Sequence, residues 1–322
     1  MRFGIIGTGR ITRRLVADLQ STPGVTVTAL ASRDAARANW SAGQYGIAKA
    51  FEGYQALLGS DLVDAVYIAL PPSLHTSWSI AAAAAGKHFL CEKPLATSLA
   101  EVNEIAAAAA KTNVRWLDAT AWLHHPRTVA MRDFVASGTI GNLRHISAAV
   151  SFFEPFQDND HRRDTSLGGG CLLDLGWYAA GCAIAVAGPA RRVFASEIQR
   201  DGAAFRVSAT LWFDNDVTAT INCGYDIATR KWMEWAGDQA SIICDDFTRP
   251  WAERPPRIWI HDRAGAVTSH QYSGSQERKM IEVLADGYDL EMFQQQAIRT
   301  QATLDAMIRS VKTEQVELVT CE

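Results

Sequence analysis

Apolar residues follow two different patterns along the 322-residue chain. In the first part, short apolar runs alternate with segments of helical spacing, which is typical of βαβ units around a parallel sheet. The run 62–70 is almost continuously apolar, as expected for a strand buried on both faces. From residue 192 onwards, short alternating segments are separated by Gly, Asp, Asn and Pro. We therefore expect an α/β chain with a parallel-sheet domain at 1–121 and a domain with a mostly antiparallel sheet at 122–322.

The same pattern predicts where the elements lie. In the first domain we expect strands at 2–6, 25–31, 62–70 and 114–121, another ending at Glu92, and helices at 10–19, from 35, at 73–85 and at 98–111. In the second domain we expect helices at 126–137, 172–186 and 291–311, and strands at 143–153, 192–200, 205–213, 217–225, 232–235, 240–244, 257–261 and 267–272. Gly86 stops one helix in the left-handed conformation, and Ser98 with Glu101 forms a capping box that opens the next.

The composition suits two hydrophobic cores, because 48% of the residues are hydrophobic. The formal net charge is -4 and no long run of Lys or Arg occurs, which argues against nucleic acid or an anionic membrane as the partner. A small molecule is expected instead. The alanine runs 81–85 and 106–110 are well short of the roughly 18 apolar residues that a membrane span needs, and the first residues indicate a core strand, not a signal peptide.

Cysteine and histidine spacing gives no sign of a metal site. The six cysteines form no Cys-x-x-Cys pair, so neither a disulfide framework nor a zinc site is indicated. The eight histidines show no His-x-x-x-His spacing. We expect reduced thiols, a cytoplasmic protein and no metal.

A glycine-rich turn follows the first strand. Gly7-Thr8-Gly9-Arg10-Ile11-Thr12 lies between a strand and a helix, which is the context that a dinucleotide fingerprint requires. Gly7 allows the tight turn, and Gly9 lets backbone N–H groups approach a pyrophosphate at the helix N-terminus. Thr12 stands where the fingerprint has Gly or Ala, and a glycine-rich turn without a nucleotide is the alternative. We predict that Gly7 to Ile11 bind the cofactor.

The second strand ends at Ser32-Arg33, about twenty residues past Gly9, where an adenosine ribose is expected. An NAD site would place Asp or Glu here, whereas Ser32 and Arg33 suit the 2′-phosphate of NADP. Asp34 is assigned to the N-cap of the next helix. NADP is the predicted cofactor, with NAD possible, and a merely solvated Arg33 is the alternative.

Two further strand ends carry candidate residues. Leu70-Pro71-Pro72 ends one apolar strand, with His75 at the next helix start, and Glu92-Lys93-Pro94 follows the next strand. Ligands bind at the carboxyl ends of strands in α/β sheets, so we place Leu70, Pro71, His75, Glu92 and Lys93 at the cofactor. A surface lysine at a strand end is the alternative for Lys93.

A second informative stretch is Gly168-Gly169-Gly170, which leads into the helix from 172. Three glycines allow a tight approach to the helix start. Asp174 and Tyr178 are four residues apart and so share one helix face, and Gly176 is expected to leave room for a ligand. A surface charge and a half-buried aromatic residue are the alternatives.

Together, the glycine turn, Pro71-Pro72-x-x-His75 and Ala85-Gly86-Lys87-His88-Phe89-Leu90-Cys91-Glu92-Lys93-Pro94 resemble the glucose-fructose oxidoreductase, inositol dehydrogenase and MocA family. The resemblance covers essentially the whole chain. It implies an N-terminal Rossmann domain and a C-terminal α+β domain with an open, mostly antiparallel sheet. It also implies that Lys93 helps to bind cofactor and substrate, and that the proline at position 94 is often cis.

The resemblance also assigns roles in the second domain. The family has three glycines followed by Asp and, four residues later, His or Tyr as the acid/base, and Asp174 with Tyr178 matches the Tyr branch related to dihydrodiol and xylose dehydrogenases. That branch carries an arginine and an aromatic residue shortly before His-Pro, where this chain has Leu123 and His124. The family's open sheets pack face to face, which implies a homodimer or homotetramer.

The expected reaction is hydride transfer between nicotinamide and a carbon that bears a hydroxyl or carbonyl oxygen. Lys93 would orient the oxygen, Tyr178 would exchange the proton, and Asp174 would bind substrate or hold Lys93. The expected substrate is a neutral sugar, cyclic polyol or dihydrodiol, because the candidate lining is aromatic and polar without a cluster of cations. The substrate residues we propose are Trp122, His125, Phe152, Arg163 and Trp177.

Two other activities are compatible with the same fold: an NAD-dependent glycosidase and a non-catalytic nucleotide sensor. Lys93, Asp174 and Tyr178 occurring together argue against the sensor. A glycosidase would return its NAD unchanged, so net cofactor reduction separates it from a dehydrogenase.

Overall fold

The computed structural model describes residues 1–153, 156 and 160–321. The chain divides into two compact units, one made of Met1–Thr120 with Glu277–Gln295 and the other of Ala121–Gln276 with the chain from Gln296 onwards. Residues 277–295 are thus grouped with the first unit, although they lie in the second of the two domains expected from the sequence. The domains 1–121 and 122–322 stay a prediction.

The first unit is built on a six-stranded sheet with the order β3-β2-β1-β4-β5-β6. Every strand pair is parallel, which confirms the expected α/β class. The strands are β1 (Arg2–Ile6), β2 (Thr26–Ser32), β3 (Lys49–Glu52), β4 (Ala65–Ile68), β5 (His88–Cys91) and β6 (Trp116–Asp118). All four residues of β4 are buried, as its apolar pattern predicted, while the short edge strand β3 is half exposed and was not predicted.

Helices connect these strands: α1 (Thr12–Ser21), α2 (Ala35–Tyr45), α3 (Tyr54–Leu58), α4 (His75–Ala84) and α5 (Leu99–Thr112). Helix α8 (Gln276–Asp286) follows β14 in the sequence and belongs almost entirely to the first unit. The carboxylate of Asp34 caps α2 by accepting from the N–H of Arg37 at 2.7 Å, and Gly86 follows α4 with φ 69°. Ser98 caps α5 by accepting from the N–H of Glu101. The capping box is only half formed, because the Glu101 carboxylate accepts from the N–H of Thr97 at 2.8 Å instead of from Ser98.

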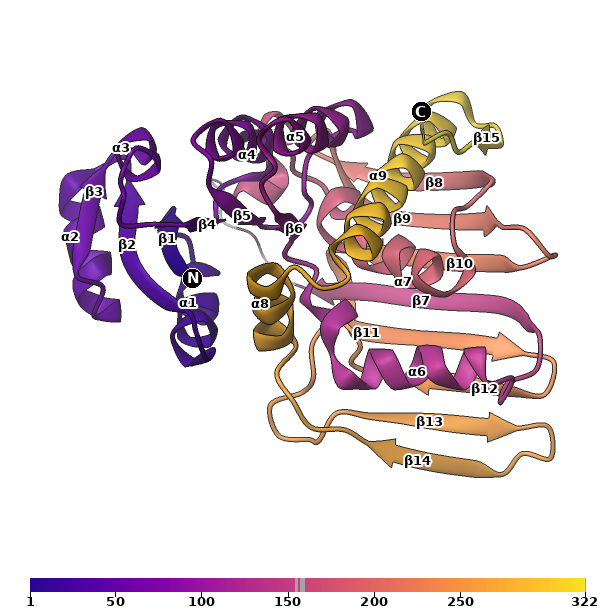
Figure 1. Cartoon of the computed structure of the whole chain (residues 1–322). Coiled ribbons are helices and arrows are strands. Elements are labelled where there is room, and N and C mark those ends of the chain that lie inside the picture. Colours follow the sequence, from indigo (N-terminus) through magenta and orange to yellow (C-terminus); the bar gives the residue numbers. More distant parts are fainter. Residues whose placement is uncertain (154–155, 157–159, 322) are drawn as a thin grey trace. The chain divides into compact units, whose positions relative to one another are not determined.

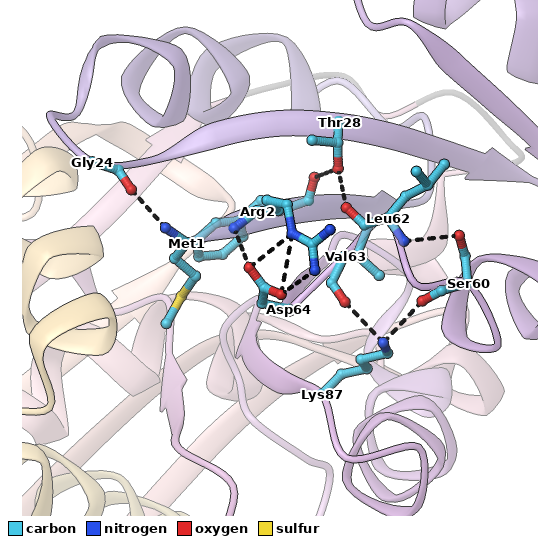
Figure 2. A network of polar contacts seen from close by, with 10 residues as sticks. Met1, Arg2, Gly24, Thr28, Ser60, Leu62, Val63, Asp64 and Lys87 are labelled. Atoms are coloured by element: carbon cyan, nitrogen blue, oxygen red, sulfur yellow. Dashed lines mark hydrogen bonds and ion pairs between the residues drawn. The ribbon is translucent and has the colours of Figure 1, made fainter.

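Figure 2 shows a polar network at the amino-terminal edge of this sheet. Arg2 and Asp64 form an ion pair at 2.6 Å, and this guanidinium lowers the pKa of Asp64 to about 2. The ammonium of Lys87 donates to the carbonyl oxygens of Ser60 at 2.9 Å and Val63 at 2.8 Å. Because the network lies where the strands begin, it leaves the opposite edge to the candidate cofactor residues.

The second unit contains a nine-stranded sheet with the order β14-β13-β12-β11-β7-β10-β9-β8-β15. Among its pairs, only β10 with β7 is parallel within the described residues, which confirms a mostly antiparallel sheet. The strands are β7 (Leu143–Phe153), β8 (Arg192–Arg200), β9 (Ala203–Trp212), β10 (Thr218–Gly224), β11 (Asp226–Gly237), β12 (Ala240–Cys244), β13 (Arg257–Asp262), β14 (Val267–Gln271) and β15 (Glu317–Leu318).

Helices α6 (Pro126–Ala136), α7 (Trp177–Ala187) and α9 (Leu290–Thr313) lie against one face of this sheet (Figure 1). Ile146, Ala148 and Val150 of β7 alternate on the buried side, each at most 4% exposed. The helical stretch Thr165–Ala187 has the length and apolar composition of a membrane span, but 72% of its apolar window is buried in the protein, as in a core helix. All six cysteines are free thiols.

Candidate active site

The predicted cofactor residues of the first unit lie along one edge of its sheet. Gly7 follows β1, Ser32 ends β2, Leu70 follows β4 and Lys93 follows β5. These strands are adjacent and parallel, so their carboxyl ends meet at the same edge. The chain order reverses between β1 and β4, which is the position where α/β sheets bind ligands. The structure therefore brings together residues that are up to 86 positions apart in the sequence.

The glycine turn has one closed and one open side. Gly7 has φ 103°, its N–H donates to the carbonyl of Ala31 at 3.1 Å, and a Cβ there would lie 2.4 Å from the carbonyl oxygen of Ala69. A Cβ on Gly9 would meet nothing closer than 3.8 Å, and Gly9, Arg10 and Ile11 are exposed. Glycine is therefore required at position 7 by the fold, while position 9 keeps the N-terminus of α1 accessible to a phosphate.

Thr12 occupies the third fingerprint position without disturbing the turn. Its side chain is fully buried, and its hydroxyl lies 3.4 Å from the carbonyl oxygen of Gly7. The N–H of Thr12 donates to Gly9 at 3.1 Å, so the turn continues through Ile11 and α1 begins at residue 12 instead of residue 10.

The end of β2 carries two cations. Ser32 is 5% exposed, and Arg33, before the N-cap of α2, and Arg37, in its first turn, are both exposed. Burial raises the pKa of Tyr54, and the positive charges of Arg33 and Arg37 oppose this shift, so both guanidiniums lie near Tyr54. Arg37 was not among the predicted residues, and its place near Arg33 follows from the start of α2 at Ala35.

His75 is tied to protein at both ring nitrogens. Nδ1 lies 2.7 Å from the carbonyl oxygen of Pro94 and Nε2 lies 2.8 Å from that of Leu70. The side chain is 1% exposed. Its contacts therefore hold the loops after β4 and β5 together, so a direct contact with the cofactor stays a prediction.

Lys93 is partly exposed and follows an acidic residue, Glu92, that is also partly exposed. The Glu92 carboxylate accepts from the hydroxyl of Tyr67 at 2.5 Å and from the N–H of Lys93 at 3.2 Å. Burial raises the pKa of Glu92, and the Tyr67 hydrogen bond and the charge of Lys93 oppose that shift. The peptide bond between Lys93 and Pro94 is cis. Asp118, at the end of β6, accepts from the hydroxyl of Thr120 and adds a second acid near Glu92.

In the second unit, the three glycines lead the chain into a π-helical turn, η5 (Leu172–Gly176), that continues into α7. Gly168 and Gly170 have φ of 81° and 108°. A Cβ on Gly169 would lie 2.6 Å from the carbonyl oxygen of His161. The tight approach to the helix is thus as predicted. The space beside Gly176 is filled by Leu172, whose Cδ1 would lie 2.8 Å from an added Cβ, so the expectation of ligand room there is wrong.

The carboxylate of Asp174 is held by two residues that the sequence did not indicate. Its Oδ2 accepts from Nε of Arg162 at 3.0 Å and from the hydroxyl of Tyr225 at 3.0 Å. Arg162 lies in η3 (His161–Arg163), and Tyr225 lies between β10 and β11. Burial and the charge of Asp174 raise the pKa of Tyr225 well above its ordinary value, so its hydroxyl keeps its proton. Asp174 and Tyr178 are both partly exposed, one turn apart.

Three of the predicted substrate residues are buried. Trp122 has no exposed surface and packs edge-on against Phe247 with ring centroids 5.1 Å apart. Trp177 is 1% exposed. His125 is fully buried, and its Nδ1 accepts from the N–H of Arg127 at 3.0 Å as the N-cap of α6. This burial weighs against direct contact with a substrate.

The other two predicted substrate residues are partly exposed. Phe152 packs on Tyr225 with ring centroids 5.3 Å apart. Arg163 forms an ion pair with Asp201 at 2.6 Å. The structure thus brings Phe152 next to the group around Asp174, where Phe156 and Phe205 also pack on Tyr225. No group of three His, Cys, Asp or Glu side chains among the described residues is placed to hold a metal ion.

Comparison with known proteins agrees with this architecture. Residues 1–119 match the oxidoreductase family with an NAD-binding Rossmann fold, and residues 128–245 match the GFO/IDH/MocA C-terminal domain. The chain belongs to the GFO/IDH/MocA family of oxidoreductases. This confirms the predicted family, the enzyme class and the NAD(P)-binding Rossmann fold.

Several relatives are similar over most of their length. An uncharacterized oxidoreductase of Rhizobium meliloti is 34% identical over 97% of both chains. The D-xylose 1-dehydrogenase (NADP(+)) 2 of Haloferax volcanii is 37% identical over 70% of both chains. A crystal structure of KijD10, a 3-ketoreductase from Actinomadura kijaniata in complex with NADP and TDP-benzene, superimposes with a TM-score of 0.88 at 29% identity, covering 96% of this chain and 97% of that one.

Proposed function

We propose that this protein is an NADP-dependent oxidoreductase that transfers a hydride between nicotinamide and a neutral sugar, cyclic polyol or dihydrodiol, with Lys93 and Tyr178 at the reacting oxygen. The main support for the proposal is that the open turn at Gly9, the buried Ser32 and the partly exposed Lys93 all lie at the carboxyl-terminal edge of the first sheet. The free thiols fit a cytoplasmic enzyme.

The residues along this edge fit a dinucleotide phosphate. The exposed N-terminus of α1 beside Gly9 offers backbone N–H groups to a pyrophosphate. Ser32, Arg33 and Arg37 offer a hydroxyl and two cations to a 2′-phosphate, and no carboxylate stands at position 32 to favour NAD. When bound, the nicotinamide ring accepts or supplies the hydride.

The chain's own residues would position the substrate and move its proton. The ammonium of Lys93, next to the carboxylate of Glu92, supplies a positive charge that orients the substrate oxygen. Tyr178 is partly exposed, and its hydroxyl would exchange the proton of that oxygen, while an adjacent cation would stabilise its phenolate. Asp174, four residues before Tyr178, would hydrogen-bond the substrate or hold Lys93.

The charge balance favours a neutral substrate. Arg162 pairs with Asp160 and Asp174, and Arg163 pairs with Asp201. These carboxylates neutralise Arg162 and Arg163, whereas a nucleotide diphosphate calls for several cations that converge on it. Relatives include both kinds of enzyme, since a dTDP-3,4-didehydro-2,6-dideoxy-alpha-D-glucose 3-reductase of Streptomyces antibioticus is 35% identical over 81% of this chain, alongside the D-xylose enzyme.

A substrate panel tests the proposal. Purified protein with NADP is given D-xylose, other aldoses, inositols and a trans-dihydrodiol, beside sugar phosphates, nucleotide sugars and 2-hydroxy acids, and cofactor reduction is followed by absorbance. Net reduction of NADP with a neutral compound supports it. Activity confined to the anionic compounds would contradict the substrate class, and product formation without net cofactor change would point to a glycosidase.

A further inference from the structure

One carboxylate oxygen joins three separate segments of the second unit. Oδ2 of Asp174 accepts from Arg162, which precedes it by 12 residues, and from Tyr225, which follows it by 51 residues, both at 3.0 Å. The three residues come from η3, the π-helical turn η5 and the corner between β10 and β11. We call Arg162, Asp174 and Tyr225 the carboxylate clamp.

We propose that Arg162 and Tyr225 are positioning residues for the reaction, which act through Asp174 to fix the turn 172–176 so that the next turn presents Tyr178 to the substrate. The inference rests on the proposed function, because it concerns the same proton carrier. It adds two residues and a route of action that the chemistry at Tyr178 alone does not require.

The geometry of the turn 172–176 explains why its orientation has to be held by hydrogen bonds. A π-helical turn widens the helix by one residue and is uncommon outside functional sites. One side of the turn packs on β10, where Sγ of Cys223 would lie 3.6 Å from a Cβ on Gly176. On that side the thiol of Cys223 also donates to the carbonyl oxygen of Cys171 at 3.5 Å, which is a weak hydrogen bond because thiols are weak donors. The two charge-assisted hydrogen bonds to Asp174 supply direction on the other side.

The donors of the clamp stay in the donating form over the working range of pH. Tyr225 is 1% exposed and keeps its proton, because burial and the charge of Asp174 raise its pKa. Arg162 also contacts Asp160 at 3.3 Å, so one guanidinium bridges two carboxylates and stays charged. The clamp is therefore a constant restraint on the helix start and not a pH switch.

The first test separates action through Asp174 from general packing. The variants are Tyr225→Phe, Arg162→Gln, Arg162→Lys and Asp174→Asn, with Arg191→Gln as control because it removes an exposed ion pair of the same unit. With NADP and the neutral substrate that the panel identifies, we expect Tyr225→Phe and Arg162→Gln to lower kcat about tenfold each, with KM and NADP affinity within about twofold. Arg162→Lys restores part of the loss, and the control matches the wild type.

The decisive comparison is made in the Asp174→Asn background. If both residues act through Asp174, adding Tyr225→Phe or Arg162→Gln there lowers kcat no further. Losses that simply multiply would show independent action and overturn the proposal. Tyr225→Phe removes a single hydroxyl and keeps the ring, so it carries the test even where Arg162→Gln fails to fold.

The second test needs no substrate. Amide hydrogen exchange of the full-length protein with NADP is measured on peptides that cover residues 171–182. Tyr225→Phe and Arg162→Lys are expected to raise exchange in this segment about tenfold, and Arg191→Gln to leave it unchanged. Unchanged exchange in both clamp variants overturns the proposal.

The two proposals fail in different ways. Full turnover of Tyr178→Phe would remove the proposed proton carrier, while the exchange experiment still decides whether the clamp restrains the turn. A slow Tyr178→Phe enzyme together with wild-type turnover in both clamp variants would instead leave the proposed function intact and remove only the clamp.

Discussion

Arg33 stands exposed directly after β2 and follows the buried Ser32, and the exposed Arg37 lies in the first turn of the next helix, α2. The three side chains combine a hydroxyl with two positive charges and no carboxylate at the strand end. A 2′-phosphate gains charge-assisted hydrogen bonds from such a group, whereas a ribose hydroxyl gains little.

Replacing Arg33 by Asp should therefore reverse the cofactor preference. Arg33→Asp is expected to weaken NADP binding at least tenfold, because a like charge faces the 2′-phosphate, and to leave NAD binding nearly unchanged. Titration of each cofactor by fluorescence measures both affinities, with the exposed Arg263→Asp as control. A wild-type protein that prefers NAD tenfold or more contradicts the assignment of the strand end.

Tyr178 is the second residue whose role a single substitution decides. Tyr178→Phe removes only a hydroxyl from a partly exposed side chain, so the fold and NADP affinity should stay as in the wild type. Turnover should fall about 10²–10⁴-fold, the usual effect of losing a positioned acid/base. Steady-state kinetics beside a Tyr45→Phe control measures this, and undiminished turnover would leave Lys93 to be tested as the proton carrier.

Residues whose role depends on local backbone geometry were predictable from the sequence. The left-handed Gly86 after α4 and the N-cap Asp34 follow from short motifs, and the structure places both as expected. Arg162 and Tyr225 were not predictable, because their meaning lies in contacts with Asp174 that span 12 and 51 residues. Periodicity and spacing carry no information on such contacts.

At the scale of elements, α6 depends on an unusual cap. His125 accepts from the N–H of Arg127, in the place where Ser, Thr, Asp or Asn is the common choice. Burial is the main cause that lowers the pKa of His125 to about 4 and that of the neighbouring His124 to about 3. Both histidines are therefore neutral in the folded protein at neutral pH.

This predicts a loss of stability in mild acid. The unfolded chain protonates these histidines near their ordinary pKa of about 6.5. The folded chain protonates His125 only near pH 4 and His124 only near pH 3. Between about pH 6.5 and pH 4 the unfolded state therefore binds more protons, and the free energy of unfolding falls as the pH drops through this range. His125→Asn keeps a capping oxygen and removes one of these groups. Its urea midpoint should vary less between pH 7 and pH 5 than that of the wild type or of His261→Asn. An equal pH dependence in all three proteins would contradict the prediction.

Element bounds were most predictable where alternation meets clear turn residues. The strands 143–153, 192–200 and 240–244 have the bounds read from the sequence. β4 is shorter than its apolar run of 62–70, because Leu62 and Val63 lie in a loop held by the Lys87 network in Figure 2. The π-helical geometry of 172–176 has no signature in the apolar pattern, since one extra residue in a turn leaves the helical spacing nearly unchanged.

At the scale of the whole molecule, the nine-stranded sheet has one face covered by helices and one face that bears aromatic side chains. Trp232 of β11 and Trp259 of β13 are partly exposed, with β12 between their strands. Phe194 and Ile198 of β8 are 41% and 52% exposed. A depression of about 350 Å³ on β7, β10 and β11 is lined by Ser147, Ala148, Ala149, Thr220, Asn222, Arg230 and Trp232. Apolar surface of this kind is stabilised when a second surface covers it.

We therefore expect a homodimer or homotetramer in which this face of the sheet meets the same face of a second copy. In such a two-fold symmetric contact, the aromatic side chains of each copy are covered by the sheet of the other. Light scattering at micromolar concentration should give at least twice the chain mass of 35.2 kDa. Trp232→Asp should lower this mass to that of one chain, because it buries an unpaired charge at the contact. Trp40→Asp, which changes a tryptophan that is 64% exposed on α2, should not alter the mass. A wild-type protein that scatters as a single chain, or a Trp232→Asp variant that keeps the wild-type mass, would contradict assembly through this face.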